Sequence, residues 1–84
     1  MRKVEWKHSA VKDLRRLAPD TVPLILDAVK RLVDDPRPPG CQKLQGSEHT
    51  YRIRVGDYRI VYSVEDRALL IWIIRVGHRK DVYR

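Results

Sequence analysis

The sequence predicts an α+β fold in which one small sheet packs against a hairpin of two helices. Two patterns carry this prediction. Apolar residues recur at helical spacing between positions 9 and 33, and they alternate with polar residues between positions 51 and 64. The chain has 84 residues, which is the size of one small domain. We therefore expect residues 1–84 to form a single domain whose functional site is shallow.

The first half of the chain is expected to hold one strand and the helical hairpin. Val4 and Trp6 alternate with charged residues, as in a short strand with one apolar face. A helix then begins at Ser9, whose hydroxyl can cap it, and stops at Pro19. Asp20 caps a second helix with apolar residues at i, i+3 and i+4 spacing. Because the link between the helices is short, they are expected to lie antiparallel.

The second half is expected to form a three-stranded antiparallel meander. Residues 34–40 include three prolines and a glycine, so this segment is a connection without regular structure. Two alternating runs, 51–55 and 58–64, flank a two-residue Gly-Asp turn, which is a strong hairpin signal. Residues 69–74 are apolar on both faces, as in an interior strand. We assign both tryptophans, Trp6 and Trp72, to the core in preference to the alternative of base-stacking platforms.

Charge and composition limit the classes of partner. Lys and Arg number 18 against 11 Asp and Glu, so the net charge of +7 favours a polyanion such as nucleic acid, an anionic membrane or an acidic protein. Neither predicted helix pairs a basic face with large exposed apolar residues, which argues against a membrane surface. With Cys41 as its one cysteine, and histidines that lack metal-ligand spacing, the chain is expected to use no metal or cofactor and to be cytoplasmic.

The predicted hairpin concentrates arginine on one face of the sheet. A two-residue turn sets Arg54 opposite Arg59, and Arg52 falls on the same side. Facing like charges cost up to about 1 kcal/mol, which an anionic ligand would relieve, and arginine suits bidentate phosphate contact. Lys43 can extend the patch. The alternative is that these arginines only keep an exposed sheet face soluble.

The end of the chain, residues 77–84, gathers the side chains that a metal-free ribonuclease needs. Such an enzyme takes a proton from a ribose 2′-hydroxyl, stabilises a crowded phosphorane and returns a proton to the 5′-oxygen. His78 suits the proton transfers, Arg79 suits the charge, and Tyr83 can stack on an unpaired base. The alternative is a tail that contributes only charge.

Together these residues resemble the RelE side of the RelE/ParE superfamily of bacterial toxin–antitoxin systems. The resemblance rests on Lys12–Leu17, Lys43–Gly46, Tyr51–Tyr62 and Val76–Tyr83. It implies a RelE-like β-α-α-β-β-β fold and an mRNA endonuclease that cuts the codon in the ribosomal A site by 2′-hydroxyl attack. It also implies a cognate acidic antitoxin that silences the toxin in a hetero-oligomer.

Position by position, the resemblance implies that Arg52 and Arg54 contact RNA and that Tyr83 stacks on or orients the nucleotide. It also implies that Arg59 and Arg79 act on the scissile phosphate. The well-studied family member has lysines at the first two positions, but an arginine stays protonated and is a poor base. His78 is therefore the candidate for the proton transfers, with Tyr83 second, and Lys80 adds a cation for RNA.

Two other functions remain open at this stage. One is a ParE-like toxin that binds DNA gyrase, because the same fold hosts both activities. Members of that branch typically lack the arginine and tyrosine ending found here. The other is an RNA-binding module without catalysis, which charge alone would support.

Overall fold

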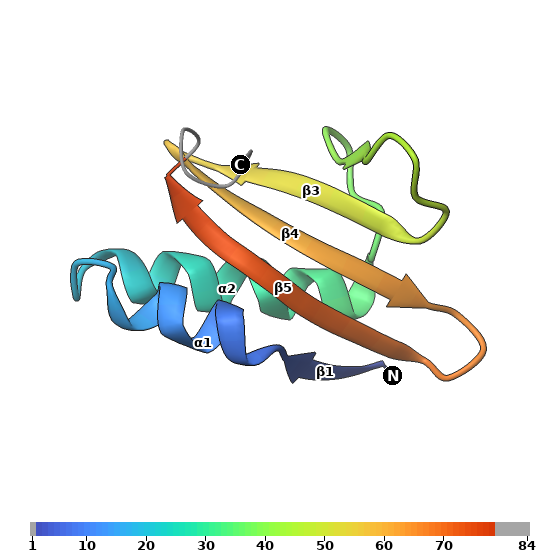
Figure 1. Cartoon of the computed structure of the whole chain (residues 1–84), viewed down its shortest axis with the longest axis horizontal. Helices are drawn as coiled ribbons and strands as arrows, with labels where there is room; N and C mark the ends of the chain where they lie inside the picture. Colours follow the sequence, from blue (N-terminus) through green and yellow to red (C-terminus); the bar gives the residue numbers. More distant parts are fainter. Residues whose placement is uncertain (1, 79–84) are drawn as a thin grey trace.

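A computed structural model describes residues 2–78 of the chain (Figure 1). The elements in chain order are β1 (Lys3–Trp6), α1 (His8–Arg15), α2 (Thr21–Asp34), β2 (Gln42–Lys43), β3 (Thr50–Val55), β4 (Tyr58–Glu65) and β5 (Leu70–His78). Figure 1 shows the two helices side by side, joined by residues 16–20. The predicted α+β class and helical hairpin are confirmed.

The sheet has five strands in the order β1-β5-β4-β3-β2. The β3-β4-β5 meander is antiparallel, as predicted, while β1 runs parallel to the first half of β5. The prediction missed β2, which pairs antiparallel with the start of β3. A strand of two residues is too short to show alternation, so only its pairing partner identifies it.

The β3-β4 hairpin has the register that the sequence predicts. Arg54 pairs with Arg59, and Val55 pairs with Tyr58 across the turn. Gly56 has φ +59°, a left-handed conformation that glycine adopts without steric cost. The two-residue turn therefore fixes which side chains share a face.

The core lies between the helices and one face of the sheet. Its fully buried members include Ile25 and Leu32 of α2, together with Ile60 and Tyr62 of β4 and Ile73 of β5. Trp6 packs against this cluster, as predicted. Within residues 2–78, no helix is long and apolar enough to cross a membrane.

The prediction for Trp72 was wrong. Trp72 stands between Ile71 and Ile73, which are both fully buried in the core cluster. Successive side chains on a strand point to opposite faces, so Trp72 lies on the face turned away from the helices, where it is half-buried. The strand also starts one residue later than predicted, because Leu69 is in the preceding turn with φ +51°.

Helix α1 covers an edge of β5 that β1 leaves open, because β1 pairs only as far as Ile73. Ser9 does not cap the helix, since Lys7 is at the N-cap position. Its hydroxyl instead donates a hydrogen bond of 2.8 Å to the backbone oxygen of Ile74. One turn later, a carboxylate oxygen of Asp13 accepts a 3.0 Å bond from the backbone N–H of Val76.

Two other predicted helix limits need correction. α1 ends at Arg15 and not at Pro19, so the connection to α2 is longer than the sequence indicated. Asp20 is at the N-cap position of α2, but its side chain makes no capping hydrogen bond. Neither change affects the direction of the hairpin.

Candidate nucleic-acid interface

The face of the sheet opposite the helices, here called the open face, carries the predicted arginines. Residues paired directly across antiparallel strands share a face. Arg54, Arg59 and Gly77 therefore form one row across three strands. Gln42, Arg52, Val61 and Arg75 form the next row.

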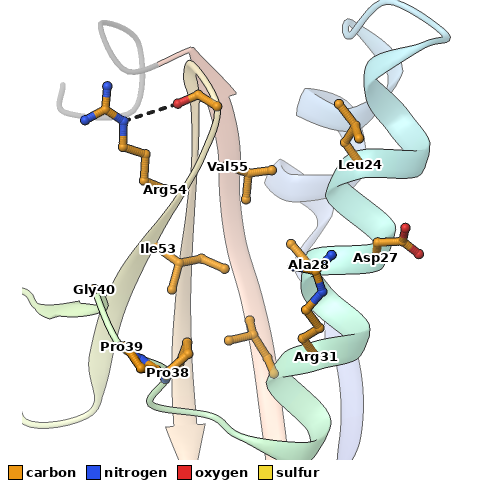
Figure 2. Close-up of a pocket in the computed structure, with 12 residues that line it drawn as sticks. Leu24, Asp27, Ala28, Arg31, Pro38, Pro39, Gly40, Ile53, Arg54 and Val55 are labelled. Atoms are coloured by element: carbon orange, nitrogen blue, oxygen red, sulfur yellow. Dashed lines mark hydrogen bonds between the residues drawn. The ribbon is translucent and has the colours of Figure 1, made fainter.

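Three arginines surround a shallow depression of about 320 Å³ on this face, here called the arginine hollow. Its lining residues are Gly40, Gln42, Arg52, Ile53, Arg54 and Arg59. The guanidinium of Arg52 donates a hydrogen bond to the side-chain oxygen of Gln42. Arg54 Nε donates a 3.2 Å bond to the backbone oxygen of Gly56, as Figure 2 shows. These bonds orient the two guanidinium groups, which is the arrangement that an oxyanion site requires.

Two glycines lie close to the hollow. Gly77 pairs with Arg59 on β5 and so belongs to the same row of the sheet. Gly40 lines the hollow from the proline-rich loop with φ +89°, where an added Cβ would meet nothing within 4 Å. The space beside Gly40, at the rim of the hollow, is therefore open.

Two predicted site residues do not belong to the hollow. Lys43 pairs with Tyr51, so the register places it on the side of the sheet that carries Tyr51 and not on the open face. His78 pairs with Tyr58, and their rings meet edge to face with centroids 5.9 Å apart. Because Tyr58 packs against the helix-side core, His78 is on the opposite face from Arg59.

Three predicted site residues, Arg79, Lys80 and Tyr83, lie outside the described residues. The structure thus brings together Arg52, Arg54 and Arg59 but does not test the tail. Within residues 2–78, no group of three or more His, Cys, Asp or Glu side chains could hold a metal ion.

A fourth arginine, Arg75 on β5, forms an ion pair with a buried carboxylate that the sequence did not predict. Arg75 Nε lies 2.7 Å from a carboxylate oxygen of Asp13, and this hydrogen bond raises the pKa of the guanidinium. Asp13 is 9% exposed. One feature of the sequence indicates that Asp13 is buried. It follows Ala10 by three residues and so lies on the apolar side of α1.

The proline-rich loop beside the hollow is anchored by Arg37, whose role sequence reasoning also missed. Arg37 Nη2 lies 2.9 Å from an Asp66 carboxylate oxygen, and its Nε donates a 3.0 Å bond to the hydroxyl of Tyr51. Arg37 lowers the pKa of the Asp66 carboxyl. The buried Tyr62 hydroxyl donates a 2.7 Å bond to the backbone oxygen of Pro36, and burial raises the pKa of this phenol. These contacts fix the loop that leads into β2 and the rim of the hollow.

A second depression lies on the helix side, between α2 and β3, and is here called the helix groove (Figure 2). Its volume is about 460 Å³, and Leu24, Ala28, Leu32, Ile53 and Val55 give it an apolar floor. Leu24 is 58% exposed although it is a large apolar side chain. The groove is thus suited to an apolar segment of another chain.

Comparison with known proteins gives consistent matches over nearly the whole chain. The family model described as "ParE toxin of type II toxin-antitoxin system, parDE" matches residues 4–83. "Toxin RelG" of Mycobacterium tuberculosis is 30% identical over 82 residues, with 96% of this chain and 94% of the relative covered.

Solved structures agree with these sequence matches. A crystal structure of an archaeal RelE–RelB complex from Pyrococcus horikoshii superposes with a TM-score of 0.82 at 29% identity, covering 95% of this chain and 97% of that one. The isolated RelE toxin of Escherichia coli superposes with a TM-score of 0.81 at 26% identity, covering 99% and 92%.

Proposed function

The chain belongs to the RelE family of toxins from type II toxin–antitoxin systems, and from this membership we propose that it is an endoribonuclease that cuts mRNA in the ribosomal A site. The observation that supports this activity most strongly is the arginine hollow. Three arginines line one depression on a sheet face that the helices leave uncovered. Arg54 and Arg59 face each other across the hairpin, and guanidinium groups are suited to bidentate contact with an RNA phosphate.

The proposed reaction is an internal attack by a ribose 2′-hydroxyl on the adjacent phosphorus. The new bond joins the 2′-oxygen to phosphorus, and the bond from phosphorus to the 5′-oxygen breaks. The 2′-hydroxyl proton is removed, and the departing 5′-oxygen receives a proton. Arg59 and Arg54 stabilise the extra charge of the phosphorane, while Arg52, oriented by Gln42, holds a neighbouring phosphate.

The proton transfers need a group other than arginine, because a guanidinium stays protonated. Among the described residues that line the hollow, no side chain titrates near neutral pH. His78 would have to act from the other face of the sheet. We therefore assign the proton transfers to the tail, with Tyr83 as the candidate, Arg79 as a further cation at the phosphate and Lys80 as an RNA contact.

Action inside the ribosome fits the shallow shape of the hollow. A depression of about 320 Å³ on an open sheet face cannot enclose and orient an RNA strand by itself. Substrate positioning contributes a large part of such a reaction's rate, so a second body that holds the RNA in place would supply what this chain lacks. The ribosome holds a codon in that manner.

An acidic antitoxin is the proposed protein partner. The archaeal relative was solved as a RelE–RelB complex, and the present chain carries a net charge of +7. The helix groove offers apolar Leu24 and Ala28 beside Arg31 and Asp27. An amphipathic segment can bury its apolar face there while its acidic residues approach the basic surface, giving a toxin–antitoxin hetero-oligomer.

Primer extension on translated mRNA after induced expression tests the proposed activity. We expect cuts within codons for the parent, and loss of both cuts and toxicity for Arg59→Ala and Arg79→Ala. Arg67→Ala, in the exposed β4-β5 turn, is the matched control and should behave as the parent. Growth arrest without cuts, with Arg79→Ala as toxic as the parent, would show that the proposal is wrong.

Gyrase poisoning is the second candidate, because the matching family model is described as a ParE toxin. A supercoiling assay with purified gyrase separates the two. Inhibition with cleaved DNA complexes and intact mRNA would favour the gyrase activity. RNA binding with neither cleaved mRNA nor gyrase inhibition would indicate an RNA-binding module without catalysis.

A further inference from the structure

We propose that Trp72 forms a second RNA subsite, a stacking platform for one nucleobase, on the same open face as the arginine hollow. The proposal rests on the proposed RNA-cleaving function and extends it to how the strand is held away from the cut. Proteins that bind single-stranded nucleic acid combine a basic groove with aromatic rings on which bases stack. The open face has both parts.

The position of Trp72 places its half-buried ring on the open face. It pairs with Ser63 of β4 on one side and with Glu5 of β1 on the other, and both neighbours are on the same face. The ammonium of Lys7 lies 4.2 Å from the centroid of the indole ring. A charged side chain can occupy that place only if the ring surface is turned outward and is reachable from solvent.

The platform is in line with the arginine hollow. Along β4 the open-face positions are Arg59, Val61 and Ser63, and Ser63 pairs with Trp72. Four residues of strand separate the two rows by roughly 13 Å. The row between them holds Arg52, Val61 and Arg75, in which Val61 is 8% exposed and the two arginines supply cations. A single-stranded RNA whose phosphate is at Arg59 can therefore extend over the sheet to Trp72.

The side chains around Trp72 fit a nucleotide. Ser63 pairs with Trp72, and its short side chain leaves room where a larger one would cover the ring; Thr50, one strand further along, also carries a short hydroxyl group. A stacked base gives more binding energy than an exposed cation–π contact, so a base can displace Lys7 from the ring. The released ammonium then pairs with the phosphate of that nucleotide. Glu5, on the far side of Trp72, marks the end of the favourable track.

Fluorescence of Trp72 and affinity for RNA test this inference together. The probe is a single-stranded 2′-O-methyl RNA of about 12 nucleotides, which cannot undergo 2′-hydroxyl attack. Trp6→Phe makes Trp72 the only indole, and we expect saturable quenching of its emission by the RNA. In the parent background, Trp72→Leu keeps the sheet covered by an apolar side chain and should weaken binding roughly tenfold, whereas Trp72→Phe keeps a ring and should bind nearly as the parent.

Two controls distinguish a loss of base stacking from a loss of charge and from a loss of folded structure. Trp72→Leu should leave the salt dependence of binding unchanged, while Arg52→Ala should reduce the slope by about one ion. Leu26→Ala, on the exposed side of α2, should bind RNA as the parent does. Melting temperatures of all variants show whether each is folded.

Three results would overturn the inference. If Trp72→Leu binds the RNA as tightly as the parent, and RNA does not quench the emission of Trp6→Phe, there is no stacking subsite at Trp72. This outcome would not affect the proposed RNA cleavage. Unchanged RNA affinity with weaker binding to the ribosome or antitoxin would mean that Trp72 contacts protein. A parent chain that neither binds the probe nor cuts mRNA would reject the proposed function itself.

Discussion

Arg59 is the residue whose surroundings most clearly separate function from stability. It pairs with Arg54 across the hairpin and with Gly77 across β5, and it lines the arginine hollow. We expect Arg59→Glu to lower RNA affinity by at least tenfold while changing the melting temperature little. The measurements are RNA titration and thermal unfolding.

Arg67→Glu is the matched control for this substitution, because it changes the net charge by the same amount from an exposed turn. It should bind RNA only slightly less well than the parent. A large fall in melting temperature for Arg59→Glu with unchanged RNA affinity would contradict the assignment.

His78 gives a second test at the level of one residue. The sequence alone favoured it as the proton-transfer group, but β5 directs it to the side of Tyr58. A general acid or base contributes about 100-fold or more to a rate, so His78→Ala should cost much less than that in single-turnover cleavage. A loss as large as that of Tyr83→Phe would return the role to His78.

Asp13 is the residue on which the end of β5 depends. It accepts hydrogen bonds from Arg75 and from the buried backbone of Val76. We expect Asp13→Ala to lower the free energy of unfolding by about 2 kcal/mol, because a buried N–H loses its acceptor. Urea unfolding measures this. Lys12→Ala, one residue earlier and exposed, should be nearly neutral, and equal effects for the two would refute the explanation.

At the scale of elements, the sequence was informative wherever a local pattern decides the structure. The two-residue turn at Gly56 sets the hairpin register, and with it the shared face of Arg54 and Arg59. The sequence could not reveal β2, because Gln42–Lys43 is a strand only through pairing with β3. It could not place Trp72 either, since an apolar run on both faces does not tell which face the helices cover.

The grouping of Arg52, Arg54 and Arg59 on one face was predictable for the same reason. The three arginines belong to one hairpin, so local alternation brings them together. His78 and Lys43 belong to other strands, and their faces depend on registers that no turn of fixed length determines. The Asp13–Arg75 pair joins residues 62 positions apart, which spacing along the chain cannot indicate.

The proline-rich loop is the element whose anchoring can be tested by pH. Tyr62→Phe removes the buried bond to Pro36 and should cost about 1 to 2 kcal/mol of unfolding free energy at neutral pH. The raised pKa of Tyr62 means that its stabilising effect is complete below its unfolded pKa, near 10, and declines at higher pH. The difference between parent and variant should therefore narrow above about pH 10.

Urea unfolding from about pH 7 to 11 measures this narrowing. Tyr51→Phe serves as the comparison, because its hydroxyl accepts an exposed bond from Arg37 and its loss should cost less. A gap between parent and Tyr62→Phe that widens as the pH rises would contradict the burial argument.

At the scale of the whole molecule, several arginines outside the hollow form ion pairs with carboxylates. Arg75 is matched by Asp13, and Arg2 and Arg37 are matched by Asp66. The arginines of the hollow instead share one row or adjoining rows of the open face. In the proposed function RNA binds the open face, while the helix groove lies on the other side of the sheet.

This division predicts that antitoxin binding and RNA binding can be impaired separately. Leu24→Glu, in the helix groove, should weaken association with the antitoxin by at least tenfold and leave RNA affinity and folding unchanged. Calorimetric titration with the purified antitoxin measures the effect. Leu26→Glu, on the same helix but outside the groove, is the control, and an equal loss for both variants would count against the groove.

The most direct test of the central claim is the cleavage rate of an mRNA held in the A site of purified ribosomes, measured for the parent and for Arg59→Ala. The proposal predicts cuts within the A-site codon that leave a 5′-hydroxyl, a rate about 100-fold lower for Arg59→Ala, and no cut where one 2′-deoxynucleotide replaces the attacking ribose. Cleavage by Arg59→Ala at the parent's rate, or intact mRNA with the parent toxin, would contradict the claim that the arginine hollow is the site of RNA cleavage.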